Sequence, residues 1–179
     1  MKKIRVLAIA SSAAIVGGTI ASAPTASASS EWSALQASLP FTVYEAFETF
    51  SMPRTEFAVN NDCSSSSSNL AVVYKSSASK KIKLYESSGT CYAGGGSYAP
   101  IAYKTFSVQD GAATAEVYPA CRTQLECEFP SDATLKSRGA MVRVVLASDG
   151  THASTHVLVK TKGISYTKIK SFVWSLGLP

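Results

Sequence analysis

Runs of apolar or alternating residues that come in pairs, each pair joined by a short polar turn, constrain the fold of this chain most strongly. The run at 81–85 places Ile82 and Leu84 on one side and polar residues on the other, as in a strand with one buried and one wet face. Asp110-Gly111 and Asp149-Gly150 separate later pairs of runs, and Asp-Gly is a strong turn signal. The predicted strands span residues 70–74, 81–85, 98–108, 113–118, 141–146 and 156–160.

Amphipathic segments precede and follow these strands. Residues 30–39 carry apolar side chains at helical spacing and end at Pro40, which predicts a short helix. Residues 165–176 predict a second helix, with Gly177 at the position that usually follows a helix end. Its apolar stripe consists of Ile169, Phe172, Val173 and Leu176. We therefore expect an α+β fold: a mostly antiparallel sheet built from hairpins, a short N-terminal helix, and a C-terminal helix packed on the sheet.

Two further segments are less regular. Residues 41–50 fit a strand by the alternation of Phe41 and Val43, and fit a helix by a capping-box pattern at 42–45, so both interpretations stay open. Residues 60–69 are polar and serine-rich, which predicts an exposed connecting loop.

The N-terminus has the form of an export signal. A basic start at 1–5 is followed by an apolar run at 6–21 and by Ala26-Ser-Ala28, the small-x-small pattern of a cleavage site. The run is shorter than the roughly 20 residues that span a bilayer, so we expect cleavage and no stable membrane span afterwards. The chain then divides into a signal peptide, 1–28, and a single secreted globular domain, 29–179, which is extracellular or associated with the cell wall.

Net charge limits the partners of the mature chain. The leader removes three of the 17 basic residues, which leaves 17 − 3 = 14 against 12 acidic ones, a net charge of +2. The mature chain therefore lacks the large excess of positive charge that is typical of nucleic-acid-binding proteins, and we expect no nucleic-acid partner.

The four cysteines are expected to form two disulfide bonds, because exported proteins meet an oxidising environment. Three pairings are possible, and proximity in the sequence favours Cys63 with Cys91 and Cys121 with Cys127. Paired thiols are unavailable as nucleophiles or metal ligands.

Tyr74 and the segments at 39–44, 81–87, 111–115, 157–160 and 163–176 resemble the uncharacterised extracellular domains of Gram-positive bacterial surface and regulatory proteins. In those domains a Pro-Phe-x-Val-Tyr segment leads into paired strands, and a closing strand leads into a terminal helix. Ala46 stands where such domains often carry proline, and Thr167-Lys168 stands where the helix start is usually acidic. The resemblance implies an architecture and brings no catalytic residues with it.

Few residues suggest a chemical site. His152 and His156 are four apart, but on a strand they would lie about 13 Å apart, too far for one metal ion. We therefore expect no metal site and no cofactor, and place both histidines at an exposed strand edge. Tyr92 and Tyr98 flank Gly94-Gly-Gly96 and are the candidate ligand-binding residues, because tyrosine offers a flat apolar ring with a polar tip.

These observations predict a secreted, non-enzymatic binding or regulatory protein that acts at or outside the cell envelope. Its partner would be an extracellular protein or a cell-wall component, bound through a sheet edge and the 91–98 segment. One alternative is an extracellular hydrolase, although no Gly-x-Ser-x-Gly motif marks a nucleophile and no catalytic residue is assigned. Another is a protease inhibitor that presents Arg122 in the loop between Cys121 and Cys127.

Overall fold

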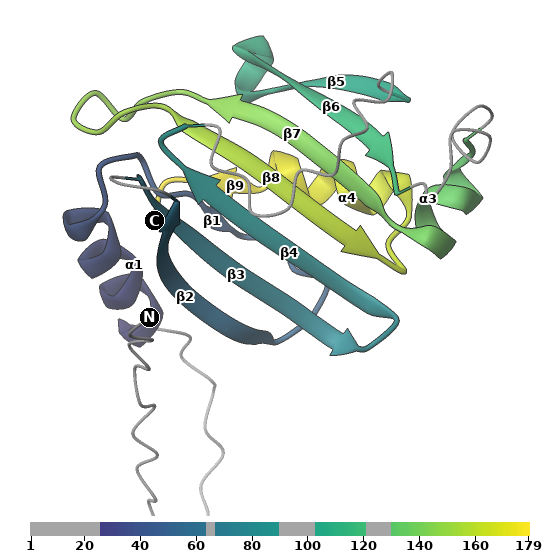
Figure 1. The fold of residues 1–179 in the computed structure, drawn as a ribbon, viewed down its shortest axis with the longest axis horizontal. Helices are drawn as coiled ribbons and strands as arrows, with labels where there is room; N and C mark the ends of the chain where they lie inside the picture. Colours follow the sequence, from purple (N-terminus) through teal and green to yellow (C-terminus); the bar gives the residue numbers. More distant parts are fainter. Residues whose placement is uncertain (1–25, 64–66, 90–102, 121–129) are drawn as a thin grey trace, which may run out of the picture.

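A seven-stranded antiparallel sheet forms the centre of the computed structural model, which describes residues 26–63, 67–89, 103–120 and 130–179. The elements are α1 (Ala26–Ser38), β1 (Glu45–Ala46), β2 (Arg54–Cys63), β3 (Ser67–Ser77), β4 (Lys80–Ser87), β5 (Lys104–Val108), the 3₁₀ turn η1 (Gln109–Gly111), β6 (Ala113–Pro119), α3 (Asp132–Arg138), β7 (Ala140–Leu146), β8 (Thr155–Lys162), α4 (Tyr166–Trp174) and β9 (Leu176–Gly177). This architecture confirms the predicted α+β class (Figure 1).

The strand order is β2-β3-β4-β8-β7-β6-β5, and every neighbouring pair is antiparallel. The three predicted hairpins are present as β3–β4, β5–β6 and β7–β8. Strand β8 pairs with β4, so residues about 75 positions apart in the sequence become cross-strand neighbours, such as Leu84 and Val159. This one pairing joins the two halves of the sheet.

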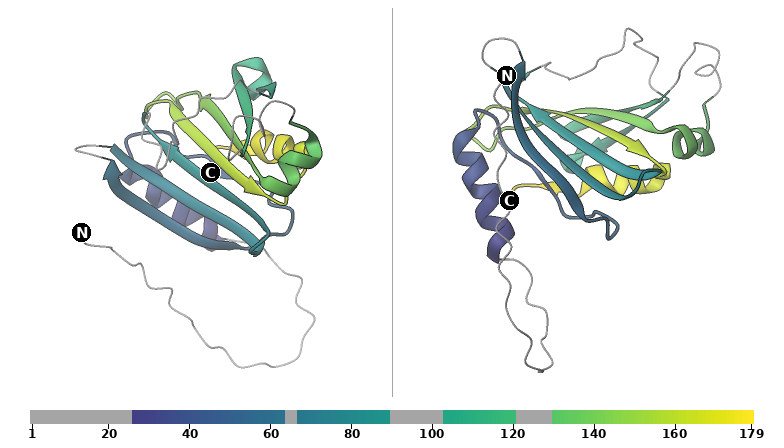
Figure 2. Two further views of the ribbon diagram at one scale, coloured as in Figure 1. Left: turned by 45° about the vertical axis from the view of Figure 1, so that its right-hand side comes forward. Right: turned by 60° about the horizontal axis from the view of Figure 1, so that its bottom comes forward.

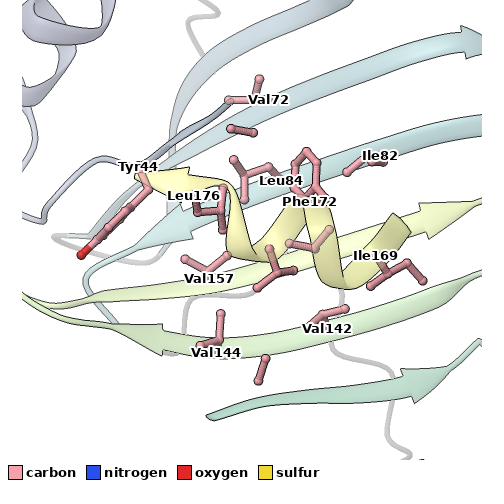
Figure 3. Packing of buried hydrophobic residues seen from close by; sticks show 14 of the residues in the cluster. Tyr44, Val72, Ile82, Leu84, Val142, Val144, Val157, Ile169, Phe172 and Leu176 are labelled. Carbon is pink, nitrogen blue, oxygen red and sulfur yellow. The ribbon is translucent and has the colours of Figure 1, made fainter. Parts of the chain in front are cut away.

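Helix α4 covers one face of the sheet, as Figure 2 shows from the side. Three residues of its predicted stripe are confirmed: Ile169, Phe172 and Val173 are fully buried in the helix. Leu176 is also buried, but it lies beyond the helix in β9, so its predicted place on the helical stripe was wrong. The ring of Phe172 meets the ring of Tyr74 edge-on at 5.9 Å between centroids. Figure 3 shows the strand residues beneath the helix, among them Val72, Ile82, Leu84, Val142, Val144 and Val157. The hydrophobic core lies between α4 and this face.

The end of α4 differs from expectation. The helix ends at Trp174, and Gly177 lies in β9, opposite Glu45 of β1, so its predicted place just after the helix was wrong. A Cβ atom at position 177 would lie 2.8 Å from Cε2 of Phe47. A side chain at this position would therefore require the exposed ring of Phe47 to move.

The segment 40–46, left open between helix and strand, is extended and crosses the end of the sheet. Thr42 donates its N–H to the Ala153 carbonyl at 2.9 Å, and its own carbonyl accepts the Thr155 hydroxyl. The Tyr44 hydroxyl donates to the Ala147 carbonyl and accepts from Gln109. We call residues 40–46 the crossing segment; it seals one end of the core.

Helix α1 packs beside β2 through Trp32, which is buried and meets the Phe57 ring edge-on at 5.1 Å. Arg54 lies over Phe57 at 4.5 Å and forms an ion pair with Glu31. The predicted N-terminal helix is confirmed, although it begins at Ala26 and ends one residue before Leu39.

Strand β2 and helix α3 were also not predicted. Strand β2 runs through Cys63 and β3 starts at Ser67, so much of the expected 60–69 loop is strand, with Asn60 opposite Asn69. Backbone pairing with β3 outweighs the polar composition here. Helix α3 follows Ser131, whose side chain accepts the Thr134 N–H at 3.2 Å, but its seven residues are too few to give a clear periodic signal.

We predict that Phe172→Ala lowers the free energy of unfolding by about 3–5 kcal/mol, because the ring is fully buried between α4 and the sheet. The matched control is Phe47→Ala, whose ring is 67% exposed and whose loss should cost less than about 1 kcal/mol. Urea unfolding measures both. Equal losses in the two variants would contradict this assignment of the core.

Candidate binding surface

The face of the sheet opposite α4 carries a cluster of charged side chains. No helix of the described part of the chain packs over it, and Figure 1 looks onto it with α4 behind the sheet. Because side chains alternate between faces, the residues between the core positions point this way. We call this surface the open face; its residues on the four central strands are Asn69, Ala71, Val73, Lys75, Lys81, Lys83, Tyr85, Ser87, His156, Leu158, Lys160, Lys162, Met141, Arg143 and Val145.

Lysines line up across the strands of the open face. Lys81 is the cross-strand neighbour of Lys75 on β3 and of Lys162 on β8, and Lys83 is the neighbour of Lys160. We call these five residues the lysine rows. Neighbouring strands lie about 4.8 Å apart and alternate residues about 6.7 Å apart along a strand, so five ammonium groups arise from a small area.

Nothing in the described part of the chain neutralises most of these charges. The ion pairs between described residues do not include Lys75, Lys81, Lys83 or Lys162. Lys75 and Lys162 are exposed, and Lys81 and Lys83 are half-buried. Like charges at directly opposed positions destabilise a sheet, so the lysine rows lower the stability of the fold.

Apolar side chains lie low on the same face. Val73, opposite Lys83, and Leu158, opposite Tyr85, are 4% and 2% exposed. Long lysine side chains cover apolar neighbours with their methylene groups while the ammonium group stays in water. The Lys160 ammonium also lies 5.6 Å from the centre of the Tyr85 ring. The surface is therefore apolar at its base and cationic at its top.

Of the acidic residues on this face, Glu116 lies away from the lysine rows, whereas Glu56 lies in line with Lys83, with Val73 between them. Glu116 on β6 is opposite Arg143, and its carboxylate accepts the Tyr118 hydroxyl at 2.6 Å. This hydrogen bond is the main reason that the pKa of Tyr118 is raised. Glu56 lies on the edge strand β2, opposite Val73. The positive end of the open face is thus formed by β3, β4 and β8.

A buried carboxyl group lies on the other, sealed face. Glu86 is fully buried between its cross-strand neighbours Leu70 and Val157. One oxygen accepts the Tyr44 N–H at 3.1 Å, and Oε1 has no hydrogen-bond partner. Burial raises the pKa of Glu86 to about 8, so the group is mainly protonated at neutral pH. Solvent does not reach the Glu86 carboxyl group, and its hydrogen bond to Tyr44 ties the crossing segment to the sheet.

The histidines do not form a metal site in the described structure. His152 lies in the β7–β8 turn, where its Nδ1 is 2.8 Å from Asp149. Hydrogen bonds from the His152 N–H and imidazole and from the Thr151 N–H lower the pKa of Asp149 to about 2. His156 lies in β8, an interior strand, so the expected strand edge was wrong. Among the described residues no three His, Cys, Asp or Glu side chains gather closely enough for a metal ion.

A shallow hollow of about 260 Å³ lies beside this turn. It is lined by Ser33, Gln36, Asp149, Leu178 and Pro179. Within the described residues no serine hydroxyl is hydrogen-bonded to the His152 ring, and Ser148 instead donates to the His152 carbonyl. The Asp149–His152 pair therefore stabilises the turn.

Several predicted residues lie outside the described part of the chain: Tyr92, Tyr98, Cys91, Cys121, Arg122, Cys127 and the side chain of Cys63. The proposed ligand-binding tyrosines, both disulfide pairings and the inhibitor loop therefore stay predictions. Sequence reasoning missed the lysine rows. The alternation of Lys81, Ile82, Lys83 and Leu84 marked one polar face, but only the pairing of β4 with β8 shows that lysines meet there.

Comparison of the chain with protein-family models, with curated proteins and with solved structures found no match. None of the helices described in the structure has the length and apolar character needed to cross a membrane.

We predict that Glu86→Gln removes a pH dependence of stability between about pH 5 and 8. The pKa of Glu86 is about 8 in the folded state and ordinarily 4.5, so its stabilising contribution is complete below pH 4.5 and is lost as the pH rises through 8. The loss amounts to about 1 kcal/mol per pH unit in that window. Urea unfolding of both proteins from pH 5.5 to 7.5 measures it, with Glu56→Gln on the exposed edge as control. If the free energy of unfolding of Glu86→Gln fell with pH as steeply as that of the wild type, Glu86 would not be the group responsible.

We predict that Lys81→Gln raises the free energy of unfolding by about 0.2–1 kcal/mol at low salt, because it removes the positive charge that lies between Lys75 and Lys162. The gain should shrink as salt screens the lysine rows. The contrasting variant is Lys104→Gln, which loses an ion pair with Asp132 at 2.7 Å and should be neutral or slightly destabilised. Thermal unfolding at two salt concentrations compares them, and destabilisation by Lys81→Gln would argue against repulsion.

Proposed function

We propose that this chain is a secreted, non-enzymatic binding or regulatory protein that acts at or outside the cell envelope and binds its partner with the open face. The observation that carries this proposal is the set of lysine rows on β3, β4 and β8. These charges lie on the face that α4 leaves uncovered, above a base of apolar side chains.

Stability alone does not account for this arrangement. The protein would be more stable with a neutral side chain in place of Lys81, because lysines at all three positions of the row place mutually repelling charges side by side. Residues that oppose stability are typical of binding sites, because a partner of opposite charge compensates for the repulsion. The same reasoning favours a negatively charged partner.

The location of the partner follows from the export signal at 1–28. Its positive n-region, short apolar run and Ala26-Ser-Ala28 direct the domain 29–179 out of the cytosol. The resemblance to extracellular domains of Gram-positive surface proteins supports the same location. We infer that the partner is a component of the wall or an extracellular protein.

We predict that the purified protein sediments with isolated Gram-positive cell envelopes, and that Lys81→Gln/Lys83→Gln reduces the bound fraction several-fold. The matched control is Lys168→Gln/Lys170→Gln, which removes the same charge from α4 on the opposite side of the sheet. Bound and free protein are quantified at increasing envelope concentrations. No binding by the wild type, or equal loss in both double variants, would contradict the proposal.

A further inference from the structure

We propose that the ligand of the lysine rows is a linear phosphodiester polymer of the cell envelope, which lies across strands β4 and β8 and reaches Lys75 on β3. This inference rests on the proposed function and specifies the chemistry of its partner. Its basis is the cross-strand register that aligns Lys75, Lys81 and Lys162 in one row and Lys83 with Lys160 in the next.

The spacing of the charges favours an extended chain of anions. Three lysines of one row span two interstrand distances, roughly 10 Å, and the second row lies about 6.7 Å away along the strands. A single anion can contact only part of this area. A polymer with a charge on each repeat meets one ammonium group after another as it crosses the strands.

The residue type favours flexible phosphate chains over precisely shaped anions. The rows contain lysine alone, and the arginine of this face, Arg143, lies near the Tyr118 ring at 5.4 Å, beyond the rows. Lysine acts as a mobile point charge with three donors, whereas arginine is the residue for planar, bidentate recognition of carboxylates. A repeating phosphodiester needs a dense row of positive charges and no fixed donor fork.

The base of the surface suits the part of such a polymer between its phosphates. Tyr85 lies beside Leu158 on the neighbouring strand, and Val73 lies beside Lys83. Val73 and Leu158 are only 4% and 2% exposed, so the short carbon linkers would lie against the half-buried Tyr85 ring and the lysine methylene groups while the phosphates contact the ammonium groups above. The lysine rows are confined to one end of the sheet. Such a local cluster of positive charge is compatible with the small net charge of +2 expected for the mature domain.

The test is a titration of the protein with fluorescent poly(glycerol phosphate) at several salt concentrations. We expect log K to fall linearly with log salt, with a slope of about −0.7 for each phosphate engaged, or about −3.5 if all five lysines of the rows are engaged. Lys81→Gln/Lys162→Gln should weaken binding roughly tenfold or more and reduce the slope by about 1 to 2. Lys168→Gln/Lys170→Gln should leave both quantities within about twofold of the wild type.

Two further polymers of equal charge distinguish the alternatives. Poly(glutamate) should bind at least roughly fivefold more weakly, and equally tight binding would overturn the assignment to phosphate. Tighter binding to an oligodeoxythymidylate would assign the surface to nucleic acid and overturn the inference as well.

Binding to whole envelopes is then measured before and after chemical removal of their phosphodiester polymers. Loss of binding on removal supports the inference. Unchanged binding overturns it, yet leaves the proposed function standing, because the open face would then recognise another envelope component. Thermal unfolding of each variant checks that the fold is retained, and we expect Lys81→Gln/Lys162→Gln to be at least as stable as the wild type.

Discussion

The packing of α4 against a single face of the seven-stranded sheet is the constraint on which the rest of the structure depends. Strand side chains alternate, so each strand that supplies Val72, Leu84 or Val157 to the core also sends side chains to the opposite face. The described chain has one helix with a long apolar stripe, and this helix seals one face. The other face therefore has to be compatible with water, and polar side chains stand there above a thin apolar base.

The same register produces both the core and the lysine rows. When β8 pairs with β4, Leu84 meets Val159 on the sealed face, and Lys83 meets Lys160 on the open one. A shift by one residue would exchange the faces and bury the lysines, so the hydrophobic core fixes where the charges lie. On the sealed face, Glu86 accepts the Tyr44 N–H and ties the crossing segment to the sheet. The pairing of β4 with β8 thus determines both the packing of the core and the position of the lysines on the open face.

Much of this fold was predictable from local patterns, and the surface was not. The stripe of Ile169 and Phe172 and the alternation around Ile82 are periodic signals that do not depend on distant residues. Strand β2 was not predicted because its polar Asn-Asn-Asp end depends on pairing with β3, and Gly177 was misplaced because its partner Glu45 is 132 positions away. The lysine rows require knowledge of which strands are neighbours, and a single sequence does not give that information.

The most direct measurement is the protection of individual lysines from acetylation when the protein is bound to cell envelopes, read by mass spectrometry. We expect Lys75, Lys81, Lys83 and Lys162 to become less reactive on binding, while Lys168 on α4 reacts as it does in the free protein. Protection of Lys168 with unchanged reactivity of the lysine rows would show that envelopes bind elsewhere on the molecule and that the open face is not the binding surface.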